Sequence, residues 1–296
     1  MEDSQPVVVE LKAWDGYSLE LTLAPSFVRA LFAKTDGVWI KLAGWRRGAR
    51  LWQEGTSVRG EKCGTLELAC WSGVWFSPRL LERIPQSIVS AYRGISLSIN
   101  PYDLDLMFVP IFLSRATSWE TNVLKWCRKL FSKVKSWSGL LNYDFSAIGS
   151  SFQLKQLGEV VEEFDSKVLP HMGESIHEIR RRLLTVRHVG PKIADAYLLF
   201  TGLDISSAPV DRHLTKMMRR LELIPHFTLP EKRLCLQYEC SECPKTHSCL
   251  RALMREQFGY AAGWLQTVMY LHDTLYCSKK ACSECPLKAM CMEWKL

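Results

Sequence analysis

The chain lacks any apolar run long enough to cross a lipid bilayer. Its longest apolar stretch extends from Leu106 to Leu113 and is broken by Pro110, whereas a membrane-spanning helix needs about 20 apolar residues. The first residues, Met1 to Ser4, are acidic, and no apolar segment typical of a secretory signal follows them. We therefore expect no membrane partner and an intracellular protein, located in the cytoplasm or nucleoid.

The sequence also lacks low-complexity segments and a large excess of one charge. Apolar residues make up 47% and charged residues 23% of the 296 residues, and the net charge is +7. This composition excludes disordered and fibrous proteins, and the length fits one large domain or two ordinary ones. The modest positive charge favours an anionic partner such as nucleic acid.

The first 76 residues are expected to form an antiparallel sheet, because short apolar runs alternate with turn signals such as Asp36-Gly37. The expected strands are Val7–Leu11, Tyr17–Leu23, Val38–Leu42, Leu66–Cys70 and Val74–Phe76. From Pro78 onward the apolar residues recur with helical spacing, for example from Val123 to Phe131. Further helices are expected after Asp211 and from about Arg251 to Tyr276, so the sequence predicts an α+β protein.

Cysteine is abundant, and its spacing is repeated. Without an export signal, the 11 cysteines do not indicate a disulfide framework. Eight of them form two quartets with the same C-x4-C-x2-C-x5-C spacing, and both quartets contain the sequence Cys-Ser-Glu-Cys-Pro. The quartets are Cys235, Cys240, Cys243 and Cys249, and then Cys277, Cys282, Cys285 and Cys291. Four thiolates at such spacing suit either Zn²⁺ or an iron–sulfur cluster.

A helix–turn–helix is expected at about residues 176–200. One helical pattern stops near Val186, and Pro191 opens the next helix at a position that proline favours. The backbone N–H groups at such a helix start can bind a phosphate. The basic residues Arg180, Arg181 and Arg182 precede the turn, where they either strengthen binding to a nucleic-acid backbone or form a solvated cluster.

Two further residues, Lys192 and Asp211, indicate a function only when they are considered together. Taken alone, Lys192 is a surface lysine or a phosphate contact, and Asp211 is the N-cap of an apolar-periodic helix. Together with the turn and with Cys277–Cys291, the sequence around Lys192 and Pro209-Val210-Asp211 resembles the helix–hairpin–helix base-excision DNA glycosylase superfamily. The resemblance covers roughly residues 100–291. The end of the chain looks like the endonuclease III branch, whereas the β-rich start looks like the 8-oxoguanine DNA glycosylase branch.

The resemblance implies roles for individual residues. Lys192 falls on the family's catalytic lysine, which is the nucleophile of its bifunctional members, and Asp211 falls on its essential aspartate. The second quartet falls on the ligands of a [4Fe–4S] cluster. The DNA-binding hairpin corresponds to Val186, Arg187, His188, Val189 and Gly190, and Arg212 and His213 at the next helix start are candidate phosphate ligands.

Three features depart from the family pattern. The hairpin, usually L-P-G-V-G, has His188 at a glycine position, where left-handed backbone geometry costs more for a residue with a Cβ. The first spacing in the terminal quartet is x4, whereas the endonuclease III branch has x6. The first quartet has no counterpart in the familiar members, and we expect it to hold a second [4Fe–4S] cluster or a zinc ion.

The resemblance therefore predicts an enzyme, a DNA N-glycosylase with AP-lyase activity through a lysine Schiff base, acting as a monomer on double-stranded DNA that contains a damaged base such as 8-oxoguanine. A monofunctional mismatch glycosylase acting on adenine, uracil or thymine, and a non-catalytic DNA-binding protein, remain alternatives. The expected domains are an antiparallel sheet domain over 1–77, a helical core over 78–234 and 250–276, an inserted four-cysteine site over 235–249 and a cluster loop over 277–291.

Overall fold

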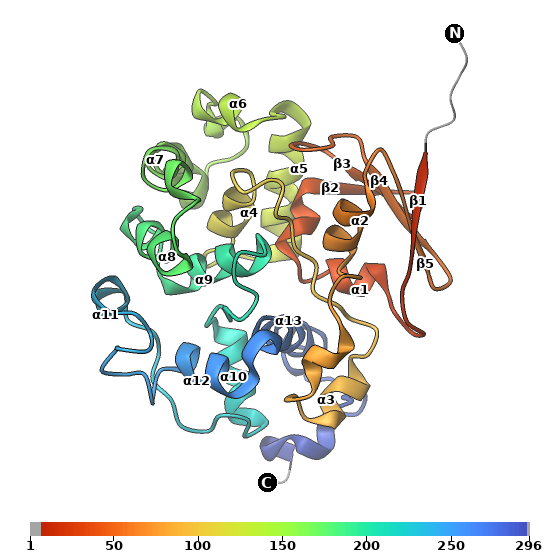
Figure 1. Cartoon of the computed structure of the whole chain (residues 1–296), viewed down its shortest axis with the longest axis vertical. Helices are drawn as coiled ribbons and strands as arrows, with labels where there is room; N and C mark the ends of the chain where they lie inside the picture. Colours follow the sequence, from red (N-terminus) through yellow and green to blue (C-terminus); the bar gives the residue numbers. More distant parts are fainter. Residues whose placement is uncertain (1–6, 295–296) are drawn as a thin grey trace. The chain divides into compact units, whose positions relative to one another are not determined.

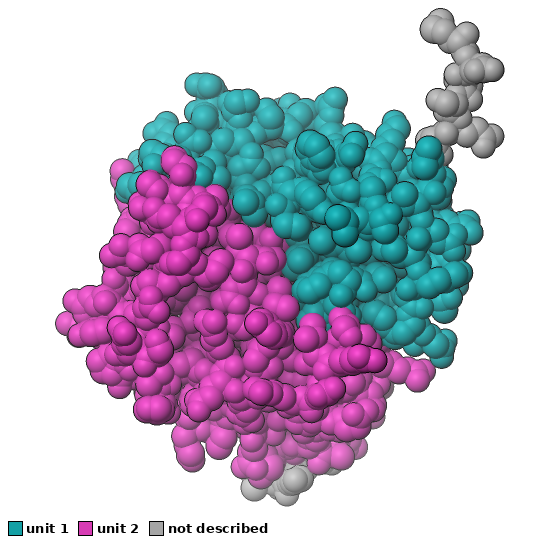
Figure 2. Space-filling view, in the orientation of Figure 1, with its two compact units in different colours: residues 1–76, 94–169 teal, residues 77–93, 170–296 magenta. Residues whose placement is uncertain are grey.

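A computed structural model describes residues 7–294 of the chain. The chain divides into two compact units, coloured separately in Figure 2. Unit 1 comprises Met1–Phe76 and Gly94–Leu169, and unit 2 comprises Ser77–Arg93 and Pro170–Leu296. The sheet thus shares its unit with several helices, and residues 77–93 belong with the C-terminal half.

Unit 1 contains one antiparallel sheet of five strands in the order β1-β5-β4-β3-β2 (Figure 1). The strands are β1 (Val8–Lys12), β2 (Phe32–Thr35), β3 (Val38–Lys41), β4 (Arg50–Glu54) and β5 (Ser57–Glu61). Strands β2 and β3 are joined at Asp36 and Gly37, which both have positive φ angles, as a tight hairpin turn requires. The expected antiparallel sheet is therefore confirmed.

Three of the five expected strands are wrong. Tyr17–Leu23 contains helix α1 (Leu19–Leu23), whose N-cap Ser18 accepts a hydrogen bond from a backbone N–H. Leu66–Cys70 lies in helix α2 (Thr65–Ser72), where the Glu67 carboxylate accepts the Gly64 N–H at 2.8 Å. Val74–Phe76 is a turn. In the two helices, capping groups prevail over a short apolar run that fits a strand equally well.

The remaining helices of unit 1 follow the sheet along the chain. They are α4 (Phe108–Leu113), α5 (Leu124–Lys133), α6 (Trp137–Leu141) and α7 (Phe152–Lys167). Helix α5 confirms the expected helical pattern, because Cys127, Leu130 and Phe131 are fully buried. Phe108 of α4 stacks on Phe164 of α7 with a ring separation of 4.1 Å, which fixes these two helices against each other.

Unit 2 is helical in its described part. It contains α3 (Gln86–Ala91), α8 (Ile176–Thr185), α9 (Pro191–Phe200), α10 (Arg212–Arg220), α11 (Lys232–Gln237), α12 (Leu250–Phe258) and α13 (Ala262–His272). The single helix expected from Arg251 to Tyr276 is wrong, because Gly259 adopts φ +54° and separates α12 from α13. The α+β class itself is confirmed. Within residues 7–294, none of the helices is both long and apolar enough to span a membrane.

Candidate active site

Helices α8 and α9 are joined by a short turn that corresponds to the expected hairpin (Figure 1). Ser175 caps α8 by accepting the Glu178 N–H at 3.2 Å. Val186 and Val189 are buried beneath the turn, whereas Arg187 and His188 are exposed. The two valines therefore fix the turn from inside, and only the backbone and the two basic side chains face outward.

The turn contains the left-handed residue that the family pattern predicts. His188 has φ +60°, which is a conformation that glycine adopts at lower cost. Gly190, by contrast, has φ −112° and caps the N-terminus of α9, so its backbone does not require glycine. A Cβ on Gly190 would meet no atom within 4 Å apart from its chain neighbours. The absence of a side chain there keeps the N-terminus of α9 open to an approaching group.

Asp211 has two separate contacts, one for each carboxylate oxygen. As the N-cap of α10, its Oδ1 accepts the Leu214 N–H at 2.8 Å. Its Oδ2 accepts a hydrogen bond from Nε2 of Gln266 at 3.3 Å, and Gln266 is buried on α13. The carboxylate is therefore held at a defined angle from two different helices.

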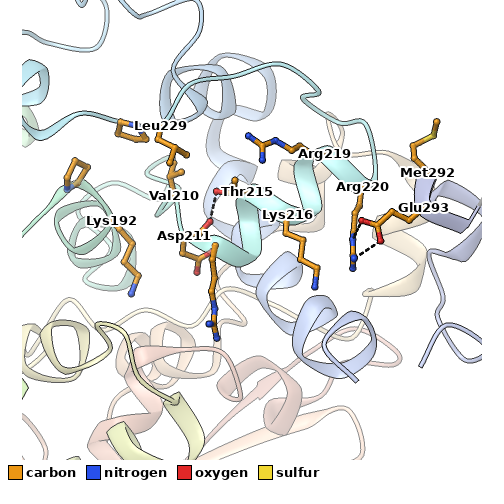
Figure 3. Close-up of a pocket in the computed structure, with 13 residues that line it drawn as sticks. Lys192, Val210, Asp211, Thr215, Lys216, Arg219, Arg220, Leu229, Met292 and Glu293 are labelled. Atoms are coloured by element: carbon orange, nitrogen blue, oxygen red, sulfur yellow. Dashed lines mark hydrogen bonds and ion pairs between the residues drawn. The ribbon is translucent and has the colours of Figure 1, made fainter. Parts of the chain in front are cut away.

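Lys192 and Asp211 line the same cavity, which has a volume of about 790 Å³. In Figure 3 their side chains extend to the same side, together with that of Lys216. Other cations, Arg212, Arg219 and Arg220, also line this cavity. The two residues predicted to be catalytic are thus brought together, although 19 positions separate them in the chain, in surroundings that favour an anionic ligand.

Arg212 and His213 differ in orientation. Arg212 is exposed, but His213 is buried, with Nδ1 at 2.6 Å from Oδ2 of Asp273. Lys216 donates to Oδ1 of the same carboxylate at 2.6 Å. Burial acts to raise the pKa of Asp273, but the hydrogen bonds from Lys216 and His213 hold it below its usual value. Contact with phosphate stays a prediction for both Arg212 and His213.

The three consecutive arginines before the hairpin all pair with carboxylates. Arg181 and Arg182 pair with Glu178 and Glu174. Arg180 is buried and pairs with Asp195 of α9 through Nε at 2.7 Å and Nη2 at 3.2 Å. Arg180 therefore joins the two helices of the hairpin from inside, so neither a backbone contact with nucleic acid nor a solvated cluster describes it.

The four cysteines of the first quartet line a second, smaller cavity. Burial raises the pKa of the Cys235 thiol, and the nearby Arg180 opposes that shift. Arg251 donates a hydrogen bond from Nη1 to the sulfur of Cys240 at 2.7 Å. Among residues 7–294, however, no three His, Cys, Asp or Glu side chains are arranged so that they could hold a metal ion.

The second quartet lies at the end of α13. Burial raises the pKa of the Cys285 thiol, and the nearby thiols of Cys277, Cys291 and Cys282 raise it further. Burial raises the pKa of the Cys277 thiol, and the nearby Arg220 opposes that shift. The Cys285 sulfur lies 3.6 Å from Nε2 of His272. The donor set in both quartets is the one that thiophilic metals prefer.

Several residues of the site were not found by sequence reasoning. Gln266 is one, and no sequence signal places its amide beside Asp211. Thr215, Lys216 and Arg219 follow Arg212 at spacings of three, four and seven residues and line the cavity with it. That helical periodicity is readable in the sequence, so these three could have been found.

The chain resembles solved structures of DNA glycosylases. An 8-oxoguanine glycosylase/lyase from Clostridium acetobutylicum superposes with a TM-score of 0.66 and 17% identity, over 91% of this chain and 97% of the other. MBOgg1, solved with a low-affinity DNA ligand, gives a TM-score of 0.68 and 15% identity over 90% and 96%. A 3-methyladenine DNA glycosylase from Archaeoglobus fulgidus gives 0.62 and 13% over 90% and 99%.

Sequence comparison alone does not detect these relationships. No protein-family model matches the chain, and no curated protein matches it. The structural similarities extend over almost the whole of each chain, and they show that this chain has the same fold as these DNA glycosylases.

Proposed function

We propose that this protein is a base-excision DNA glycosylase that removes a damaged base and then cleaves the strand as an AP lyase. The observation that carries the proposal is the cavity lined by both Lys192 and Asp211. It lies at the start of α9, directly after the turn that joins α8 to α9. One structure with this fold is an 8-oxoguanine glycosylase/lyase bound to double-stranded DNA with cytosine opposite 8-oxoguanine. We therefore choose 8-oxoguanine opposite cytosine as the first substrate to test.

The reaction requires that the damaged nucleotide leave the base stack, because the sugar C1′ atom is inaccessible inside a duplex. The neutral amine of Lys192 then forms a bond to C1′, and the electron pair of the glycosidic bond leaves with the base. An amine in this role has to be desolvated or surrounded by cations to be neutral, and Arg212, Arg219 and Arg220 line the same cavity. Asp211 accepts the proton that the amine loses and offsets positive charge that develops on the sugar.

Strand cleavage follows from the covalent product. Opening of the sugar ring leaves a Schiff base between Nζ of Lys192 and C1′. Loss of a proton from C2′ then breaks the bond from C3′ to the phosphate oxygen, and the phosphate leaves with the electron pair. A monofunctional glycosylase activates water instead and does not need the lysine, so Lys192 separates the two mechanisms.

The proposal includes a [4Fe–4S] cluster held by the second quartet. Cys277, Cys282, Cys285 and Cys291 would hold such a cluster, and its contribution would be structural, with no part in base removal. It would order the terminal loop, in which Lys279 and Lys280 are exposed and could contact DNA. Lys288 lies in the same loop. Cys282→Ser is expected to weaken DNA binding, and unchanged binding in a folded variant would contradict this role.

The test is borohydride trapping on duplexes that contain 8-oxoguanine opposite cytosine, thymine glycol, uracil or an abasic site. Wild type is expected to form a covalent adduct with the abasic duplex and with one lesion duplex, and Lys192→Gln is expected to form none. Equal trapping by both proteins would refute the assignment of Lys192. Base release without trapping, followed by strand breakage only after alkali, would indicate the monofunctional mechanism.

A further inference from the structure

The inserted four-cysteine site at 235–249 and the ten residues before it form one segment, residues 225–249, that is folded without a hydrophobic core. In this segment, all of which the structure describes, no residue from Pro225 to Ser248 is buried, and its one helix is the short α11. A segment that buries so little apolar surface cannot offset its loss of conformational entropy by packing alone. Small segments of this kind are usually held by disulfides or by a metal.

The backbone of this segment brings the four cysteines to one place. Cys249 pairs with Thr228 in an isolated parallel bridge, and its N–H donates to the carbonyl of Lys245 at 2.7 Å. The Thr246 N–H donates to the carbonyl of Cys243 at 2.9 Å, which closes a turn. All four cysteines line one cavity. Within residues 7–294 their side chains do not form a group that could hold a metal ion as they stand, so metal binding requires these side chains to turn toward one another.

The side chains behind the quartet carry an uncompensated positive charge. Arg180 and Arg251 are both buried and both donate to Oδ1 of Asp195 at 2.7 Å, and Asp195 is fully buried. Two guanidinium groups and one carboxylate leave one positive charge, and burying an unbalanced charge is costly. Arg251 also donates to Ser207 at 3.2 Å, but a hydroxyl group carries no charge. The compensating negative charge must come from elsewhere.

The cysteine sulfurs supply further acceptors to both arginines. Nη1 of Arg251 lies 2.7 Å from the Cys240 sulfur, and Nη2 of Arg180 lies 3.6 Å from the Cys235 sulfur. A guanidinium group can only donate, and a neutral thiol is a weak acceptor. A metal bound by four thiolates, either Zn²⁺ or a [4Fe–4S]²⁺ cluster, carries two negative charges on the thiolates and metal together. Such a centre compensates the excess charge of the arginines.

We infer that Cys235, Cys240, Cys243 and Cys249 bind a tetrathiolate metal centre, and that the Arg180–Asp195–Arg251 network couples this centre to the hairpin. Arg180 lies on α8 and Asp195 on α9, so the network contacts both helices that present the turn. The inserted segment thereby braces the hairpin through the buried faces of its two helices. This inference concerns metal binding and rigidity, and it stands whether or not the protein removes a base.

The first test measures iron and zinc per chain by mass spectrometry in protein purified without oxygen. Cys240→Ala/Cys243→Ala is expected to lose one centre, as either iron or zinc, and to keep the metal that Cys282→Ala/Cys285→Ala loses. The matched control, Cys63→Ala/Cys70→Ala, removes two half-buried thiols of unit 1 and is expected to lose no metal. Iron loss identifies a cluster and zinc loss identifies a zinc site. Metal content equal to that of the control overturns the inference.

A second test addresses the arginine network and does not require a cysteine variant to fold. Arg251→Lys keeps the positive charge but loses the several N–H donors of the guanidinium group. Loss of a residue that hydrogen-bonds to a metal ligand typically lowers metal affinity about 10–100-fold. We expect metal at the first quartet to pass to a competing chelator at roughly 10–100-fold lower chelator concentration in this variant, with the second quartet unaffected. Arg255→Lys, on the exposed part of α12, is the control. Identical release from both variants overturns the role of Arg251.

A third measurement tests the coupling to the hairpin. In wild type, chelation of the first centre is expected to raise amide hydrogen exchange at least about tenfold across residues 225–249 and also at the turn 186–190. Increased exchange in residues 225–249 alone would refute the coupling to the hairpin. Unchanged exchange in both regions would refute any stabilising effect of the metal centre on the segment or on the hairpin.

Discussion

Replacement of Asp211 separates the structural role of this residue from its proposed chemical role. The carboxylate caps α10 through Oδ1 at 2.8 Å from the Leu214 nitrogen, and its negative charge lies at the helix N-terminus. Asparagine caps as well as aspartate, so Asp211→Asn is expected to lose only the charge–dipole interaction, about 0.3–1 kcal/mol of the free energy of unfolding. Asp211→Ala loses the cap as well, for a total of about 1–2 kcal/mol. These losses correspond to a decrease in Tm of roughly 2–4 °C per kcal/mol.

The effect on chemistry is expected to follow a different order. Both variants lack the carboxylate that accepts the proton of the amine, so both should lower the single-turnover rate of base release about 10²–10⁴-fold. The amide that Asp211→Asn introduces would face Nε2 of Gln266, and a flip of the Gln266 amide restores a complementary donor–acceptor pair there.

The assay combines thermal unfolding with single-turnover base release on the lesion duplex that wild type cleaves. Asp211→Asn that retains base release close to the wild-type rate would refute the chemical role and leave Asp211 as an N-cap. If Asp211→Asn lowers the Tm as much as Asp211→Ala does, the expectation that asparagine replaces aspartate as the N-cap is refuted.

Three further predictions concern the hairpin and unit 1. His188→Gly should raise the free energy of unfolding by about 0.5–1 kcal/mol, because the left-handed conformation costs about 1–2 kcal/mol for a residue with a Cβ and the added chain entropy of glycine offsets part of that; a lower Tm would contradict this. Gly190→Ala should change the free energy of unfolding by no more than about 0.5 kcal/mol. It should weaken binding to an abasic duplex roughly tenfold, which is about the value of one hydrogen bond to a charged group. An unchanged Kd in a binding titration would show that DNA does not approach the backbone at this position. Lys41→Met should lower the free energy of unfolding, measured with urea, by about 3–5 kcal/mol, because the buried Asp103 carboxylate, 2.7 Å from Nζ, loses its cation. The control Lys34→Met removes an exposed lysine and should lower it by at most about 1 kcal/mol.

The sequence predicted the sheet better than the individual strands. The Asp36-Gly37 turn and the apolar run after it identified β3 and the turn before it, but not β2. Strands β4 and β5 carry charged residues such as Arg50 and Arg59, so they lack the apolar run on which the prediction depended. Their stability comes from pairing with neighbouring strands, which is a property of the sheet and not of either segment alone.

The proposed catalytic pair was predictable because it rests on two local signals and one resemblance. Pro191 marks the start of α9, and Asp211 marks the start of α10, so the residues at both helix starts could be named in advance. Gln266 could not be named, because its contact with Asp211 arises only from the packing of α10 against α13. Arg180 was misjudged for a related reason, since a run of three arginines looks exposed until a buried carboxylate on another helix is known.

Helix α9 connects the two conclusions drawn for unit 2. Lys192 and Asp195 are three residues apart, and such residues lie on neighbouring parts of a helix surface. Lys192 lines the open cavity, while Asp195, almost one turn further on, is fully buried and held by two arginines. A nucleophile has to be placed within a fraction of an ångström of its target, which demands that the supporting backbone be fixed by buried contacts. Asp195 supplies that anchor one turn from the amine. A weakened first quartet is therefore expected to lower the rate of adduct formation through the position of Lys192, without any direct contact between the metal centre and the DNA.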